Sequence, residues 1–191
     1  MRIKQSIIDS IEVKKRILED DQLMQRVREV ADICILSLQN GGKVLFCGNG
    51  GSAADAQHLA AELSGRFYYD RPPLYSEALH VNSSYVTAVA NDYSYDEVYA
   101  RMVRAMGKEG DVLIGISTSG NSGNILKAFD AAKECQMKCI GFTGETGGKM
   151  KDASDVLINI PSKDTPRIQE SHIMIGHIIC ELIESNIFPK K

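Results

Sequence analysis

The chain has 191 residues, and 43% of them are hydrophobic, which is enough to bury one core. The formal net charge is −3 and no basic tract is present, so the composition gives no electrostatic reason to expect nucleic acid as a partner. No apolar run approaches the roughly 20 residues of a membrane span, and residues 1–9 mix charged with apolar side chains, unlike a signal peptide. We therefore expect a single cytoplasmic domain, residues 1–191, with no membrane partner.

Residues 1–40 are expected to form two helices, because apolar residues recur at helical spacing on both sides of a break at Asp20 and Asp21. Asn40, Gly41 and Gly42 end the second helix. The apolar face of these helices packs either on its own domain or on a neighbouring subunit.

Residues 41–191 alternate between β-rich and helical segments. Strands are expected at 43–47, 77–81, 112–116, 138–142 and 156–160, and helices at 53–64, 83–90, 95–106, 122–134, 149–153 and about 165–185. This alternation predicts an α/β fold with a doubly wound, mainly five-stranded parallel sheet, flanked by helices, and with binding loops at the carboxyl ends of the strands. The five cysteines contain no C-x-x-C pair and are expected to be reduced.

A glycine-rich loop, Gly48-Asn49-Gly50-Gly51-Ser52, follows the first expected strand. Its glycines let backbone approach a ligand, its serine can cap the next helix, and the amides at that helix's N-terminus favour an anion. The loop also fits the G-x-G-x-x-G/A fingerprint of dinucleotide sites. No carboxylate ends the next expected strand to hold a ribose, however, which disfavours a nicotinamide cofactor.

The helix after this loop carries His58 and Glu62, four residues apart and therefore on one face. This spacing suits metal ligation or acid–base chemistry, and it is also common on solvated helix faces.

A second polar loop follows the expected strand at 112–116 and contains Ser117, Thr118, Ser119 and Ser122. Short hydroxyls together with helix N-terminal amides can bind a phosphate monoester without a lysine. A Ser/Thr-rich segment of this kind is often only a turn, but a second such loop between a strand and a helix favours the phosphate interpretation.

The last expected helix carries Gln169, Glu170, His172 and His177. Gln169 and His177 are about 80° apart around the helix axis, so they can converge on one cleft without stacking, whereas Glu170 is better aligned with His177. On spacing alone, we interpret the histidines of this helix as structural. The same interpretation applies to His80.

The motifs CGNGGSAADAQH, ISTSGNS and RIQESH resemble, in order and spacing, the SIS (sugar isomerase) domain family over essentially the whole chain. Within that family, the combination of His58, Glu62, Gln169 and His177 resembles the enzymes that isomerise sedoheptulose 7-phosphate. The resemblance implies the SIS fold and a homotetramer with active sites at subunit interfaces. It also implies conversion of sedoheptulose 7-phosphate to D-glycero-D-manno-heptose 7-phosphate through an enediol, for lipopolysaccharide or capsule heptose synthesis.

The resemblance further implies one zinc per subunit, held by His58, Glu62, Gln169 and His177. An enediol route needs a base and an acid, and we expect Glu62 to be the catalytic base and His177 the acid. A metal-bound carboxylate is a poorer base and a metallated ring nitrogen carries no transferable proton, so the two duties alternate or use different atoms. The resemblance leaves His172 and Glu170 as structural residues or as residues that support the ligands from behind. The implied substrate-binding residues are Asn49, Gly50, Gly51, Ser52, Glu62, Asn91, Asp92, Ser117, Thr118, Ser119, Ser122 and Gln169.

The chain departs mildly from the family pattern at Pro166, where Ala or Asp is usual, and at Leu59, which replaces a frequent Phe. Two functions of other classes are alternatives: a scaffold that binds the replication initiator and a sugar-phosphate-sensing module. The full set of four ligand-type residues disfavours the scaffold. The lack of an attached DNA-binding segment disfavours the sensor.

Overall fold

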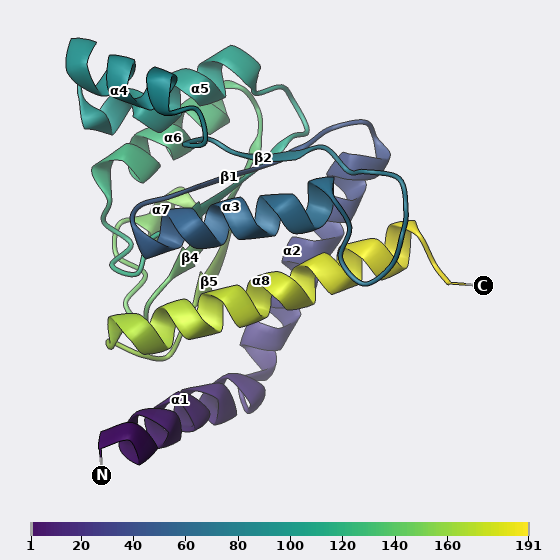
Figure 1. Ribbon diagram of the computed structural model, residues 1–191, viewed down its shortest axis with the longest axis vertical. Helices are drawn as coiled ribbons and strands as arrows, with labels where there is room; N and C mark the ends of the chain where they lie inside the picture. The colour runs from purple at the N-terminus through teal and green to yellow at the C-terminus, as the bar shows by residue number, and fades with distance from the viewer. Residues whose placement is uncertain (1, 191) are drawn as a thin grey trace.

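After two N-terminal helices, strands and helices alternate along the chain in the computed structural model, which describes residues 2–190 (Figure 1). The elements are α1 (Arg2–Leu18), α2 (Asp21–Gln39), β1 (Val44–Gly48), α3 (Gly51–Ser64), β2 (Ser76–Ala78), α4 (Ser83–Asp92), the 3₁₀ helix η1 (Tyr95–Glu97), α5 (Val98–Met106), β3 (Val112–Ile116), α6 (Gly123–Glu134), β4 (Lys138–Thr143), α7 (Met150–Ala153), β5 (Val156–Asn159) and α8 (Thr165–Ile187).

The five strands form one parallel sheet in the order β2-β1-β3-β4-β5. Successive side chains of β1 enter two different cores, as the pleat requires. Val44 and Phe46 pack with α2, α3 and α8, whereas Leu45 and Cys47 pack with α5 and α6. The prediction of a doubly wound, five-stranded parallel sheet flanked by helices is therefore confirmed.

The strand order reverses between β1 and β3, which is where doubly wound sheets bind ligands. The glycine loop follows β1 and the serine loop follows β3, so both predicted binding loops lie at this switch point. The helices that they start, α3 and α6, have no side-chain hydrogen bond at their N-caps. Their first backbone amides are therefore not occupied by a capping side chain.

Several expected boundaries were wrong, each for a local reason. The helix after the glycine loop begins at Gly51, and its N-cap is Gly50 at φ +58°, so Ser52 lies inside the helix and does not cap it. The strand expected at 77–81 is Ser76–Ala78, because the chain then turns toward Asn82, whose side chain caps α4. The expected 95–106 helix divides into η1 and α5, and α8 extends two residues beyond 185.

The cysteine prediction is confirmed, since all five are free and four of them are buried.

Among residues 2–190, no helix is long and apolar enough to cross a membrane.

Candidate functional site

Two parallel helices, α3 and α8, lie side by side over one face of the sheet (Figure 1). They approach closely because Gly176 has no side chain: a Cβ there would lie only 2.5 Å from Cδ1 of the buried Leu59. Leu59 directly follows His58, and Gly176 directly precedes His177. The close approach of the helices therefore brings the two histidines together although 119 residues separate them.

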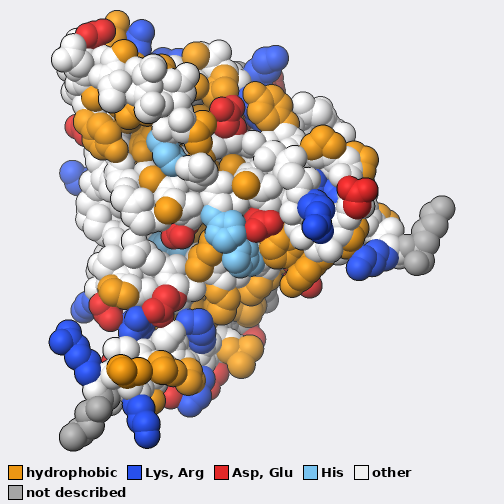
Figure 2. Space-filling model, in the orientation of Figure 1, with side chains coloured by type: hydrophobic (Ala, Val, Ile, Leu, Met, Phe, Trp, Pro, Cys, Tyr) orange, Lys and Arg blue, Asp and Glu red, His pale blue; other side chains and the backbone are white. Residues whose placement is uncertain are grey.

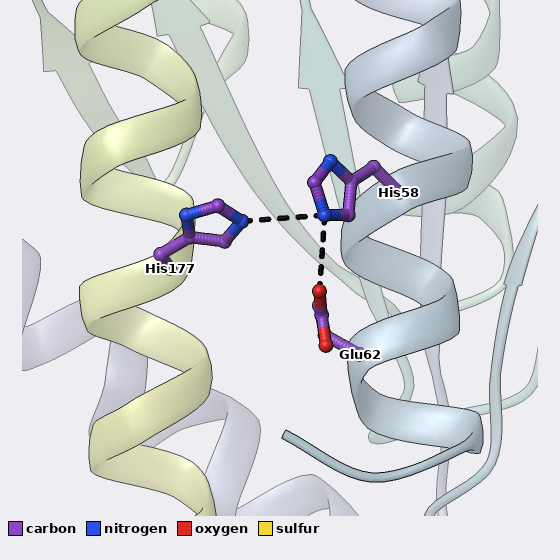
Figure 3. Close-up of side chains that lie close together, drawn as sticks. All are labelled: His58, Glu62 and His177. Carbon is purple, nitrogen blue, oxygen red and sulfur yellow. Dashed lines mark hydrogen bonds and ion pairs between the residues drawn. The ribbon is translucent and has the colours of Figure 1, made fainter. Parts of the chain in front are cut away.

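Three of the predicted side chains meet between these helices (Figure 3). His58 Nε2 lies 3.0 Å from Glu62 Oε1 and 3.5 Å from His177 Nε2, and one ligand atom from each residue falls within 4.8 Å of the other two. The His58 side chain is 49% exposed and that of Glu62 is 23% exposed. His58 is exposed and His177 is half-buried, and Figure 2 shows histidine side chains at the surface on this face of the molecule.

This cluster fits a zinc ion on geometric grounds. Zinc bonds of about 2.0–2.1 Å at tetrahedral angles separate two ligand atoms by about 3.4 Å. The observed 3.5 Å and 3.0 Å separations bracket that value, and 3.5 Å is longer than a good hydrogen bond between the two ring nitrogens. Two imidazoles and a carboxylate match the three-ligand catalytic zinc sites, which keep an open position for substrate.

Two residues near the cluster were missed by the sequence analysis. Asp55, one turn before His58 on α3, has a buried Oδ2 with no hydrogen-bond partner; burial raises the pKa of its carboxyl, and His58 and His177 oppose that shift. Phe67, which follows α3, packs its ring 5.7 Å from the His177 ring. The i, i+3 relation of Asp55 to His58 was visible in the sequence, but nothing there indicated Phe67.

The remaining polar residues of α8 have distinct positions. Gln169, the fourth predicted ligand, lies against Gly51 at the start of α3, where a Cβ on the glycine would be 2.7 Å from its Nε2. Glu170 binds Arg167 and Ser10. His172 is fully buried, bonded through Nε2 to the Thr143 carbonyl, and burial lowers its pKa to about 4.

The glycine loop is hydrogen-bonded to α6, the helix that follows the serine loop. Asn49 and Asn124 exchange two amide hydrogen bonds, of 2.8 and 2.9 Å, and the Tyr95 hydroxyl donates to the same Asn49 oxygen. Tyr99 bonds the Gly48 carbonyl. The Asn49 side-chain oxygen and one of its two Nδ2 hydrogens are thus used within the protein, which leaves the second Nδ2 hydrogen as the side-chain donor available to a ligand.

In the serine loop, Ser117 Oγ lies 2.8 Å from Ser122 Oγ and 3.4 Å from Ser119 Oγ. Ser117 is buried and Ser119 is exposed, so the hydroxyl cluster reaches from the sheet to the surface. Thr118 and Ser119 also line a cavity of about 310 Å³ that extends to Lys163. Ser52 is buried at the first turn of α3.

Asn91 and Asp92 are not brought to the cluster. They form the last turn of α4 and are bonded to each other, and α4 lies at the top of the view, well away from α8 (Figure 1). The sequence predicted that this helix would end at residue 90, so that Asn91 and Asp92 would follow it; instead they lie within its last turn. His80 is half-buried just beyond β2, and burial lowers its pKa.

Comparisons with known proteins agree with this geometry. The SIS domain model matches residues 9–144. The chain is 53% identical to a phosphoheptose isomerase of Burkholderia pseudomallei and 54% identical to one of Aneurinibacillus thermoaerophilus, in each case over 99% of this chain and 96% of the relative. The solved phosphoheptose isomerase of Neisseria gonorrhoeae superposes with a TM-score of 0.91 at 44% identity, covering 96% of this chain and 97% of that one.

Family model, full-length relatives and a closely superposing structure thus point the same way as the histidine–glutamate cluster, and the chain belongs to the SIS domain family as a phosphoheptose isomerase.

Proposed function

We propose that this chain converts sedoheptulose 7-phosphate to D-glycero-D-manno-heptose 7-phosphate at the His58–Glu62–His177 cluster, in the synthesis of heptose for bacterial surface polysaccharide. The observation that carries the proposal is the convergence of these three side chains between α3 and α8. Family membership supports an isomerase, and the cluster supplies the acid–base groups that interconversion of a ketose and an aldose needs.

The distance between loop and cluster suits a sugar phosphate. Gly51, at the start of α3, precedes His58 by seven residues, which is about 10 Å along a helix. A seven-carbon sugar with phosphate at one end and a carbonyl near the other spans a gap of this order. We therefore assign the phosphate to the hydroxyls of Ser52, Ser117, Ser119 and Ser122, with Thr118, and to the amides at the start of α3 and α6.

The reaction requires a proton to leave C1 and a proton to return to C2. Glu62 takes the C1 proton; its Oε1 faces His58, which leaves Oε2 as the basic atom. His177 protonates the carbonyl oxygen at O2. The enediol then accepts a proton at C2 and loses the O1 proton, which gives the aldose.

We assign one zinc per subunit to His58, Glu62 and His177, with Gln169 as the fourth ligand. When bound, the metal would polarise the substrate carbonyl and stabilise the negative charge on its oxygen. With Nε2 of His177 in the ligand set, Nδ1 is the ring atom that can carry a proton. Gln169 lies against Gly51, about 10 Å along α3 from His58, so its assignment as the fourth ligand rests on the family resemblance. Its position beside the glycine loop suits a contact with the sugar.

The experiment that tests this function is incubation of the zinc-loaded protein with sedoheptulose 7-phosphate and, separately, with unphosphorylated sedoheptulose. We expect the aldose phosphate from the first and little product from the second. A protein that binds the phosphorylated sugar without forming aldose would favour the sensor or scaffold alternatives.

Ser119→Ala tests the phosphate assignment. An exposed hydroxyl that donates to an ionised group contributes on the order of 1.5–3 kcal/mol, so we expect KM for the phosphorylated sugar to rise roughly 10- to 100-fold. Binding of the unphosphorylated sugar should not change. Steady-state kinetics check both, and an unaltered KM for the phosphorylated sugar would move the phosphate site away from this loop.

For the assembly, we infer that residues 1–40 pack against other copies in a homotetramer and that residues 41–191 form the sugar-phosphate-binding core. The first helix supports this inference because it exposes an apolar face: Ile3 is 79% exposed, Ile7 is 56% exposed and Leu18 is 73% exposed. Glu62 and His177 come from one chain, so a neighbour at the interface would add other groups, with Asn91 and Asp92 as candidates.

The double change Ile7→Glu and Ile11→Glu should reduce the mass in light scattering from that of a tetramer to that of a smaller species, because charge on this face opposes its burial. The exposed polar changes Lys4→Glu and Gln5→Glu on the same helix serve as the control. A variant that keeps the parental mass would show that this face is not the contact.

A further inference from the structure

A buried ion pair lies beside the cluster. Arg71, in the segment between α3 and β2, places Nε 3.0 Å from Oε1 of Glu184 on α8, and each side chain is 1% exposed. Desolvation of two charges largely offsets their attraction, so burial of such a pair is weak grounds for a role in stability. Its other contacts indicate what it does.

Arg71 holds the end of α3, where the last carbonyls of a helix lack partners within the helix. Its Nη2 donates to the carbonyl oxygen of Glu62 at 2.8 Å, and its Nη1 donates to those of Leu63 and Gly65 at 2.7 and 3.2 Å. The turn of α3 that carries the Glu62 carboxylate is therefore tied directly to the guanidinium.

Glu184 holds the segment that supports His177. Its two carboxylate oxygens accept the backbone N–H groups of Phe67 and Tyr68 at 2.9 and 2.8 Å, and the Phe67 ring packs against the His177 imidazole. Burial acts to raise the pKa of Glu184, but these two amides and Arg71 outweigh it and lower the pKa, so the carboxylate stays charged. Glu184 also follows His177 by seven residues and thus lies on the same face of α8.

We propose that Arg71 and Glu184 are positioning residues for the cluster: together they fix the Glu62 turn of α3 and the Phe67 support of His177 at one spacing. The inference rests on the proposed function, because it concerns the geometry that binds metal and moves the proton. The contact of Gly176 with Leu59 fixes the distance between α3 and α8 beside the two histidines. The Arg71–Glu184 pair fixes that distance at the C-terminal end of α3, where Glu62 lies.

The test uses Arg71→Lys, which keeps the charge but loses the planar fork, and Glu184→Gln, which keeps the shape but loses the charge. The matched control is Lys43→Met, which breaks a different buried pair, Lys43–Asp111 at 2.5 Å, just before β1 and β3. Co²⁺ titration followed by visible absorption measures the metal site independently of turnover, and thermal unfolding measures stability.

Arg71→Lys and Glu184→Gln are expected to weaken Co²⁺ binding about 10- to 100-fold, as changes in the groups that orient metal ligands do, and to lower kcat at saturating metal with little change in KM. Lys43→Met is expected to lower the melting temperature and leave Co²⁺ affinity unchanged. Phe67→Leu keeps the backbone N–H that donates to Glu184 and removes only the ring beside His177, so it should also weaken Co²⁺ binding. This variant still tests the proposal if Arg71→Lys and Glu184→Gln do not fold.

Parental Co²⁺ affinity in Arg71→Lys, Glu184→Gln and Phe67→Leu, with lower stability alone, would overturn the positioning role and leave the isomerase assignment intact. Failure of the parent chain itself to bind Co²⁺ would overturn the metal site, and the positioning proposal with it.

Discussion

Replacement of Glu62 by Gln should lower kcat by about 10²–10⁴-fold, because the amide keeps the size of the carboxylate but cannot accept the C1 proton. KM should stay within a few-fold of the parental value, since the serine and glycine loops are unaltered. The measurement is steady-state kinetics on sedoheptulose 7-phosphate at saturating zinc, with metal content determined in parallel because Glu62 is also an assigned ligand.

Glu29→Gln, an exposed carboxylate on α2, provides the control for the chemical change alone. It should leave both kinetic constants as they are. If Glu62→Gln turns over within a few-fold of the parent while fully metal-loaded, Glu62 is not the base and the proton must go to another group.

The second large effect concerns the metal. Structural zinc in four-ligand zinc-finger peptides is bound by about 10–16 kcal/mol, or about 2.5–4 kcal/mol per ligand, so His58→Ala should weaken zinc binding by roughly 10²–10³-fold. The parent should hold about one zinc per chain, lose activity to a strong chelator and regain it on addition of Zn²⁺. Elemental analysis and activity after chelation check these outcomes.

His80→Ala is the matched control, since it removes an imidazole that lies outside the cluster. It should bind zinc as the parent does. Full activity of rigorously metal-free parent would show instead that an enediol route without metal operates at Glu62 and His177.

The fold was largely predictable because its signals are local. Continuous apolar runs such as 112–116 identify strands buried on both faces, and the loops that end them fall at the carboxyl edge by the rules of parallel sheets. The element boundaries that were predicted wrongly depend on the backbone conformation of single residues. Gly50 adopts a positive φ and takes the cap that Ser52 was expected to provide, and no propensity distinguishes those two arrangements.

The candidate site was also predictable only in part, where the signal was local. The pairing of His58 with Glu62 follows from helical spacing alone, but the approach of His177 depends on the contact of Gly176 with Leu59, which only tertiary packing creates. Arg71 and Glu184 are 113 residues apart and carried no signal in the sequence. The roles assigned to Gln169, Asn91 and Asp92 come from family resemblance and stay predictions.

We propose that the cluster between α3 and α8 isomerises a heptulose phosphate by proton transfer through Glu62. The most direct measurement is an NMR time course of zinc-loaded protein with sedoheptulose 7-phosphate, labelled with ¹³C at C1, in D₂O. We expect an aldose C1 signal with deuterium at C2, because Glu62 is partly exposed and exchanges its proton with solvent, and we expect that signal to be lost in Glu62→Gln. Absence of aldose from the zinc-loaded parent, or its undiminished formation by the Glu62→Gln variant, would show that this cluster does not isomerise the sugar by proton transfer through Glu62.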